Sequence, residues 1–98
     1  MKKWMAILVI LMPGVVFAQN HDVCSLESQQ AEVIMDLRQS NLPMRDLVSM
    51  MKAQGMYDKK TEVMVRVAYE RPEARSEKYK EKQKVEFGNA FYQDCINR

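Results

Sequence analysis

The stretch SEKYKEKQKVEFGNAFYQDCINR, residues 76–98, decides how this chain is organised. It predicts a helix over residues 76–97, capped by Ser76, with Cys95 near its end. The other cysteine, Cys24, lies near the opposite end of the sequence. We therefore expect a Cys24–Cys95 disulfide that holds the first and last helices antiparallel. Closing a loop of about seventy residues stabilises a small domain by roughly 4 kcal/mol in the chain-entropy model.

Residues 1–18 have the parts of a secretory signal peptide. Met1-Lys2-Lys3 is followed by an apolar run to Met12, a Pro13-Gly14 pair expected to break a helix, and small residues at Val16 and Ala18. We predict cleavage after Ala18, which leaves one domain over residues 19–98. The alternative is an uncleaved membrane anchor, but the apolar run is shorter than the roughly 20 residues that span a bilayer. After cleavage, we do not expect the mature domain to insert stably into a membrane.

The charge balance argues against nucleic acid as a partner. The whole chain has 15 basic and 13 acidic residues, and Lys2 and Lys3 leave with the leader, so the mature domain is neutral. Acidic residues exceed basic ones over 19–58, and the reverse holds over 59–84. We expect the two parts to attract each other within the fold, with surface pairs worth at most about 1 kcal/mol each; a partner surface is the second interpretation.

Apolar periodicity and turn residues predict an all-α domain of four helices, at about 26–40, 43–54, 59–70 and 76–97. Asn41-Leu42-Pro43 is expected to end the first helix, Gly55 the second, and Asp58 to cap the third. The apolar arc of the first helix, expected to pack inward, comprises Val23, Leu26, Val33, Ile34 and Leu37.

The third and fourth predicted helices differ in how deeply they should pack. The third is apolar over more than half its circumference and belongs in the middle of the packing, although its valines leave a strand as the minor alternative. In the fourth, Phe87 to Ile96 should anchor the helix, whereas Glu77 to Lys84 should lie on the surface as a solvated arm. Lysines at 78, 80, 82 and 84 spread around that helix, which is typical of a solvated face.

Residues for catalysis are not assembled in this sequence. The only histidine, His21, lies in a polar lead with nothing to hold it, and we predict neither an enzyme nor a cofactor. One weak metal candidate remains. If Gln19 becomes the N-terminus, its amine, two amides and the His21 imidazole offer the four in-plane nitrogens that Cu(II) or Ni(II) prefers.

Methionine is abundant in the mature sequence, which carries it at 35, 44, 50, 51, 56 and 64. The favoured interpretation is gap-filling in a small core; Cu(I) binding and contact with varied partners are the alternatives. In the predicted second helix Met50 lies away from the apolar stripe. We therefore expect Met50, Met56 and Tyr57 to form an exposed apolar patch. The resulting candidate interaction surface is Met44, Leu47, Met50, Met51, Met56 and Tyr57.

The mature chain resembles a group of small exported proteins of Gram-negative bacteria and their phages. The residues that carry the resemblance are Cys24, Ile34-Met35-x-x-Arg38-Gln39, Met44, Ala68-Tyr69-x-x-Pro72, Phe87 and Tyr92-x-x-Cys95. They are packing and disulfide residues, so the resemblance implies an architecture and no activity. The architecture alone is also similar to that of small periplasmic acid-stress chaperones, and phage antiholins are another small exported helical class.

These observations favour a periplasmic protein that acts by binding an as yet unidentified protein partner, as a monomer or weak dimer. The alternatives are a periplasmic holdase that exposes apolar faces, Cu(II) or Ni(II) binding through the mature N-terminus, and a phage-type lysis regulator.

Overall fold

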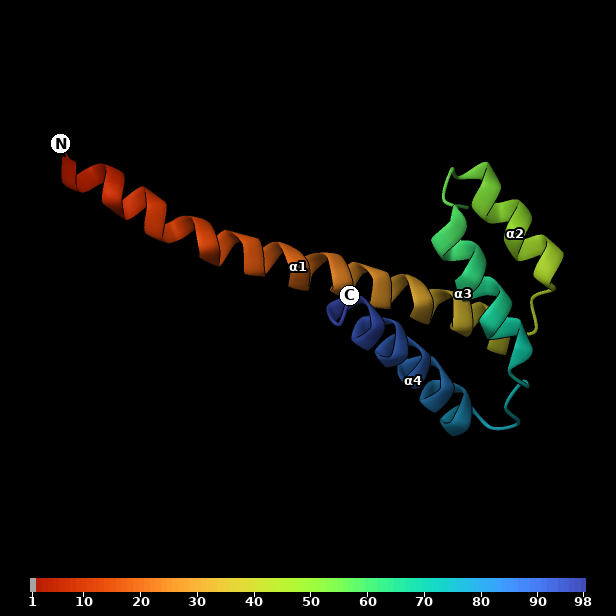
Figure 1. Cartoon of the computed structure of the whole chain (residues 1–98). Coiled ribbons are helices and arrows are strands. Elements are labelled where there is room, and N and C mark those ends of the chain that lie inside the picture. The colour runs from red at the N-terminus through yellow and green to blue at the C-terminus, as the bar shows by residue number, and fades with distance from the viewer. Residues whose placement is uncertain (1) are drawn as a thin grey trace.

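The computed structural model describes residues 2–98, with side chains from Asn20 onwards. Four helices follow one another: α1 (Lys2–Gln39), α2 (Met44–Ala53), α3 (Lys59–Glu70) and α4 (Glu77–Ile96), and the described residues form no strand. Figure 1 shows α4 running back along the second half of α1 in the opposite direction, while α2 and α3 lie near the C-terminal end of α1, on its other side. The predicted all-α fold with antiparallel first and last helices is confirmed, and the strand alternative for residues 59–70 is wrong.

The predicted start of the first helix is wrong. We expected helix from about residue 26, after a break at Pro13-Gly14 and a polar lead, but α1 is continuous from Lys2. A proline inside a helix removes one backbone hydrogen bond and costs about 3 kcal/mol, which does not stop the helix where the turns on both sides continue it. Further along, the contacts of His21 and Cys24 with α4 hold the polar segment in helical form.

Two helices end in the same backbone motif. At the end of α1, Asn41 adopts φ 68°, and the N–H groups of Leu42 and Asn41 donate to the carbonyls of Leu37 and Arg38. At the end of α2, Gly55 adopts φ 70° and the equivalent bonds run to Met51 and Lys52. This pair of bonds defines a Schellman motif, which needs a left-handed residue at that position. The predicted ends at Asn41 and Gly55 follow from this requirement.

The starts of α3 and α4 are capped by side chains, as predicted. The Asp58 carboxylate accepts from the Thr61 N–H at 2.9 Å, while the Thr61 hydroxyl accepts from the Asp58 N–H, forming a capping box. The Ser76 hydroxyl accepts from the Tyr79 N–H at 3.3 Å. The starts of α3 and α4 are thus set by residues next to them in the sequence.

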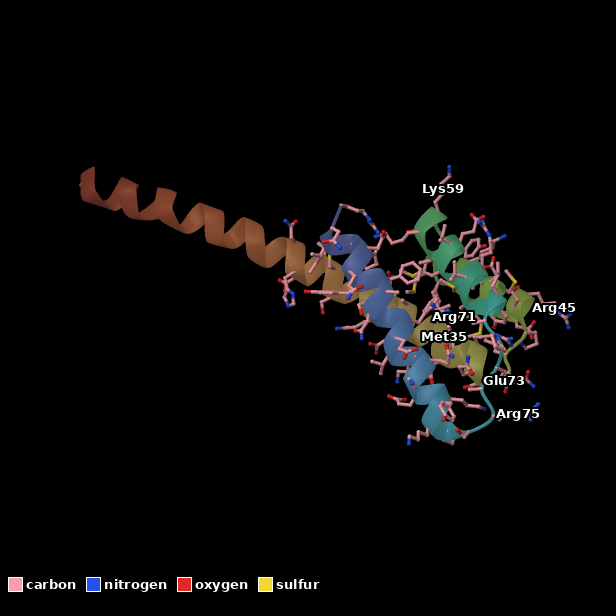
Figure 2. The ribbon with its side chains drawn as sticks, turned by 60° about the horizontal axis from the view of Figure 1, so that its bottom comes forward. Met35, Arg45, Lys59, Arg71, Glu73 and Arg75 are labelled. Carbon is pink, nitrogen blue, oxygen red and sulfur yellow. A yellow bond between two sulfur atoms is a disulfide. The ribbon has the colours of Figure 1, made fainter. Side chains whose placement is uncertain are left out.

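The core forms where α1, α2, α3 and α4 meet (Figure 2). On α4 it is entered only by Phe87, with the neighbouring Gly88 buried against α1. A Cβ on Gly88 would lie 2.5 Å from Cγ of Glu32, so glycine permits the close approach of the two helices. The buried apolar residues are Cys24, Ala31, Ile34, Met35, Leu47, Met51, Met64, Val65, Ala68 and Phe87.

The two halves of α4 differ broadly as expected. Glu77, Lys78 and Tyr79 are exposed, so the first half lies on the surface. In the second half Phe87 is buried and Cys95 is bonded to α1, but Ile96, expected to be anchored, is 50 % exposed. At 100° per residue, the turn that directs Cys95 toward α1 points its neighbour Ile96 away.

A buried amide fastens the α3–α4 connection to α1. The Gln39 side chain is 2 % exposed; its Oε1 accepts from the Ala74 N–H at 2.7 Å, and its Nε2 donates to the Pro72 carbonyl at 3.3 Å. Beside it, the Arg38 guanidinium donates to the Arg71 carbonyl. Part-buried backbone groups of this connection therefore have hydrogen-bond partners although they lie outside any helix.

The two left-handed residues give a matched pair of substitutions. Gly55→Ala should lower the free energy of unfolding by about 1 kcal/mol, because no atom lies near the added Cβ and only the positive φ opposes it. Asn41→Gly should be neutral or slightly stabilising, since glycine takes that conformation freely. Urea unfolding of both variants checks this, and an equal loss in each would contradict it.

The Asp58 cap should contribute to the pH dependence of stability. The Thr61 backbone N–H, then the Thr61 hydroxyl, lower the pKa of the Asp58 carboxyl from its ordinary 3.8. A lowered folded pKa gives stability that is present above the unfolded pKa and is lost as pH falls through the folded pKa. Asp58→Asn keeps an acceptor and cannot titrate. The stability difference between wild type and Asp58→Asn should therefore shrink between pH 5 and pH 2, measured by urea unfolding; a constant difference would contradict this.

Candidate interaction groove

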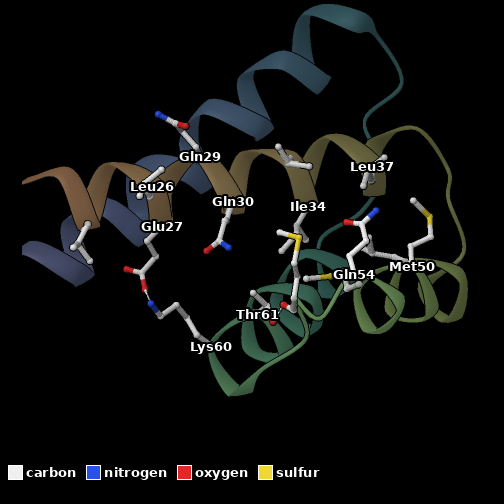
Figure 3. A pocket seen from close by; sticks show the side chains of 15 residues that line it. Leu26, Glu27, Gln29, Gln30, Ile34, Leu37, Met50, Gln54, Lys60 and Thr61 are labelled. Atoms are coloured by element: carbon white, nitrogen blue, oxygen red, sulfur yellow. Dashed lines mark hydrogen bonds and ion pairs between the residues drawn. The ribbon is translucent and has the colours of Figure 1, made fainter.

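An open groove of about 540 Å³ lies between α1 on one side and α2 and the start of α3 on the other. Its floor is made by buried core residues, among them Ile34, Leu47 and Met51. Figure 3 shows Gln30 extending from α1 into this space and Glu27 reaching toward Lys60 at one end. The groove is lined by Val23, Leu26, Glu27, Gln29, Gln30, Val33, Ile34, Leu37, Leu47, Met50, Met51, Gln54, Met56, Lys60 and Thr61.

The α1 wall of the groove exposes large apolar side chains. Val23 is 55 % exposed, Leu26 62 % and Val33 58 %. The arc predicted to pack inward is therefore corrected: of its five members only Ile34 is buried, and Leu37 is half-buried. The disulfide and the approach at Gly88 turn a different side of α1, with Cys24, Ser28 and Ala31, toward α4.

The exposed wall has a regular spacing. Val23, Leu26, Gln30, Val33 and Leu37 follow one another at intervals of three and four residues, as the inward positions of a coiled-coil helix do. In a coiled coil these positions face a second helix, and here they face the groove. Sequence reasoning identified the apolar members of this stripe but assigned them to the core. The three–four spacing, with the polar Gln30 in its middle, was the available indication that the stripe faces another helix.

The opposite wall contains part of the candidate surface predicted from the methionines. Met50 and Met56 are 46 % and 43 % exposed and line the groove, whereas Leu47 and Met51 are buried and form its floor. Met44 and Tyr57 lie outside the lining: Met44 is exposed, and Tyr57 is half-buried beneath the Lys52 ammonium, 5.5 Å from its ring centre. The structure thus brings four of the six residues, Leu47, Met50, Met51 and Met56, to a groove whose α1 wall was not anticipated.

A buried carboxylate closes one end of the groove. Glu27 is 2 % exposed, and its Oε1 lies 3.2 Å from Nζ of Lys60 at the start of α3. Arg98 approaches both Glu27 oxygens at 3.2 Å and also contacts Asp94 at 3.0 Å. Hydrogen bonds to Asp94 and Glu27 raise the pKa of the Arg98 guanidinium above its ordinary value. The Glu27 cluster, meaning Glu27, Lys60, Asp94 and Arg98, ties α1, α3 and α4 together.

The expected attraction between the acidic and basic parts of the chain is realised at one point. Among described side chains, Lys60–Glu27 is the ion pair that joins residues 19–58 to residues 59–84. The remaining pairs are local or involve Arg98: Arg45–Asp46, Arg66–Glu62, Lys80–Glu73, Lys84–Glu81, Arg98–Glu27 and Arg98–Asp94. On α1, Asp22 and Asp36 are therefore exposed and outside these ion pairs.

His21 is not in a mobile lead, and that prediction is wrong. It lies on α1, and its Nδ1 is 2.8 Å from the Tyr92 hydroxyl of α4, with the two rings edge to face. The disulfide one helical turn further on keeps the two helices close enough for this contact. Nδ1 is thus engaged within the fold, and the described His, Cys, Asp and Glu residues form no cluster of three or more around a possible metal position.

Comparison with known proteins gives no match: no family model, curated protein or solved structure is significantly similar to this chain. Among the helices of the described residues, none combines the length and apolar character needed to cross a membrane. The groove and the Glu27 cluster are therefore the features from which a function can be argued.

The Glu27 cluster predicts a non-additive loss of stability. Lys60→Met alone should cost little, because Arg98 still pairs with the carboxylate, and Arg98→Met alone should behave likewise. The double variant leaves a buried carboxylate unpaired and should lower the free energy of unfolding by about 3–5 kcal/mol. Urea unfolding at pH 7 measures this.

Adding Glu27→Gln to the double variant supplies the control. A neutral amide of the same shape removes the unpaired charge, so most of the lost stability should return. Strictly additive single losses, or no recovery with Glu27→Gln, would contradict the account of the cluster as a charge pair.

Proposed function

We propose that this protein is a small exported binding protein that holds a helix of another protein in its groove and carries out no catalysis. The observation that supports this most directly is the exposure of Val23, Leu26 and Val33 on one wall, opposite Met50 and Met56 on the other. Contiguous apolar surface of this kind on a soluble domain marks a contact site.

The form of the groove favours a helix as the bound element. Helix-in-groove recognition uses apolar side chains spaced three and four residues apart on both partners, and the α1 wall has that spacing. From Val23 to Leu37 the wall is about 21 Å long at 1.5 Å per residue, which corresponds to four helical turns. Methionine on the second wall suits such a site because its flexible thioether adapts to the side chains it meets.

Export is part of the proposal, with the periplasm as the expected destination. The disulfide supports an oxidising compartment, and residues 1–18 have the composition of a leader. Cleavage after Ala18 would leave every groove residue, both cysteines and the His21–Tyr92 contact in the mature domain. The groove is thus compatible with the processed protein.

A holdase is the second candidate, because an exposed apolar groove can also bind unfolded clients. Such a protein should lose tertiary order reversibly near pH 2–3, with thirteen carboxylates available to titrate. Near-ultraviolet circular dichroism across an acid titration separates the holdase from the helix-binding protein. A helix-binding protein should keep its folded groove and its selectivity at neutral pH, and its binding should not require an acid transition. Metal binding and lysis regulation gain no support from the geometry described above.

The proposed function predicts selective loss of capture. Leu26→Asp with Val33→Asp changes two exposed side chains, so the fold should persist while the affinity for a helical partner falls at least tenfold. Tyr79→Asp, an equally exposed change on α4, serves as the matched control. The measurement is quantitative pull-down from periplasmic extract with the disulfide intact, with thermal unfolding recorded for each variant.

The informative result is a protein captured by wild type and by Tyr79→Asp but not by the groove variant. If every captured protein is retained equally by all three, the groove is not the binding site and the proposed function fails.

A further inference from the structure

Two acidic side chains of α1 lie next in sequence to residues that line the groove. Asp22 and Asp36 are exposed on α1, and among described side chains neither is in an ion pair. The Glu27 cluster at the end of the groove contains two acidic and two basic groups and is balanced. The charge that a bound segment would meet along α1 is therefore acidic.

These acidic groups lie along one flank of the apolar stripe. Asp22, Gln29 and Asp36 are spaced seven residues apart, each one position before a member of the stripe (Val23, Gln30 or Leu37). In Figure 3 Gln29 points to the outer side of α1, away from α2 and α3. In a coiled coil, residues at this flanking position face the charged side chains of the partner helix and select it by charge.

We infer that the groove is specific for a basic amphipathic helix of another protein. The inference rests on the proposed function. The bound helix would have about four turns, apolar residues at three–four spacing directed into the groove, and lysine or arginine on the edge that faces Asp22 and Asp36. Gln30, the polar member of the stripe, favours a polar side chain opposite it, which sets the register of the bound helix.

A second copy of this chain fits the groove poorly. Antiparallel pairing of two α1 helices would place Asp22 of each near Asp36 of the other, and like charges in such pairs are destabilising. Parallel pairing would bring the opposite flank of α1 into contact with the partner helix. On that flank Glu27 and Ile34 are buried, on the side of α1 that faces α2 and α3 of the same chain. Helix α4 of a second copy is not basic, because its four lysines are balanced by four acidic residues. It also lacks a continuous apolar stripe, since its exposed large apolar residues are Tyr79, Val85 and Ile96.

The two acidic positions are not equivalent after leader cleavage. A mature N-terminus at Gln19 would bring its amine and the positive end of the helix within one turn of Asp22. Asp36 stands more than four turns from that end, so these positive charges are too far away to offset it. We therefore expect Asp36 to contribute more than Asp22 to the choice of partner.

Three labelled synthetic peptides of about eighteen residues test the inference on the processed, disulfide-bonded protein. One has leucine at the groove-facing positions and lysine on the flanks; the second replaces those lysines with glutamate; the third has the composition of the first with its leucines scrambled. Fluorescence anisotropy at 50 and 150 mM salt gives the affinities. The lysine peptide should bind about tenfold tighter than the glutamate peptide at the lower salt, and the preference should narrow at the higher salt.

Charge reversal on the protein supplies the decisive arm. Asp22→Lys with Asp36→Lys should invert the preference, with Asp36→Lys alone giving the larger share. Glu70→Lys with Glu86→Lys changes the net charge equally at exposed positions outside the groove lining and should leave the preference unchanged.

Each other outcome is distinguishable. Equal binding of the lysine and glutamate peptides, abolished by the Leu26→Asp and Val33→Asp variant, overturns the charge specificity and leaves the groove function intact. Binding that the groove variant does not affect, or no preference for either helical peptide over the scrambled one, overturns the proposed function itself. A dimer seen by analytical ultracentrifugation that this variant dissociates makes a second copy the occupant and overturns the inference.

Discussion

The bond between Cys24 and Cys95 is the constraint on which the rest of this structure depends. It joins residues 71 positions apart, with their Cα atoms 5.5 Å from each other. Its effect is orientational as well as entropic, because it fixes which side of α1 meets α4. Once Cys24 faces α4, Ser28 and Ala31 follow at one-turn intervals, and Gly88 lets the helices approach closely. The apolar stripe of α1 is then turned away from α4.

Polar groups on α1 complete what the disulfide begins. Along this helix, His21 contacts Tyr92, Glu27 holds Arg98 and Lys60, and Gln39 binds the α3–α4 connection. Arg38 and Gln39 bind the α3–α4 connection at this junction, and the Arg71 guanidinium covers the Phe87 ring, 5.1 Å from its centre. A small domain with one aromatic residue in its core depends on such links, since apolar burial alone is limited at this size.

The groove follows from the same arrangement. Because α1 turns one side to α4 and places Ile34 and Met35 in the core shared with α2 and α3, Val23, Leu26 and Val33 of the stripe remain exposed and Leu37 is only half-buried. The Glu27 cluster holds the start of α3 beside α1 and so maintains one end of the groove. A small helical domain that leaves such a stripe open, beside acidic side chains that are in no ion pair among the described residues, has the features expected of a surface for a complementary helix.

Local features of the sequence were sufficient to predict much of the fold. Asn41, Gly55, Asp58 and Ser76 mark helix ends because capping and positive φ are properties of a few neighbouring residues, and the two cysteines defined their own pairing. The start of α1 could not be predicted in this way. Local propensities favour a break at Pro13-Gly14 and in the polar segment 19–22, whereas α1 is continuous from Lys2, and its contacts with α4 begin at His21.

The candidate site depended on tertiary structure. Periodicity identified the apolar side of α1, but an apolar stripe has the same pattern whether it faces its own core or a partner. The rotation of α1 imposed by the disulfide and Gly88 decided that Val23, Leu26 and Val33 are exposed and that Glu27 and Gln39 are buried. The sequence by itself therefore determined the helices and the bond that joins them, because these depend on short-range chemistry and a unique cysteine pair. Only the tertiary structure decided which face of α1 remained open, because that choice depends on the packing of residues far apart in the chain.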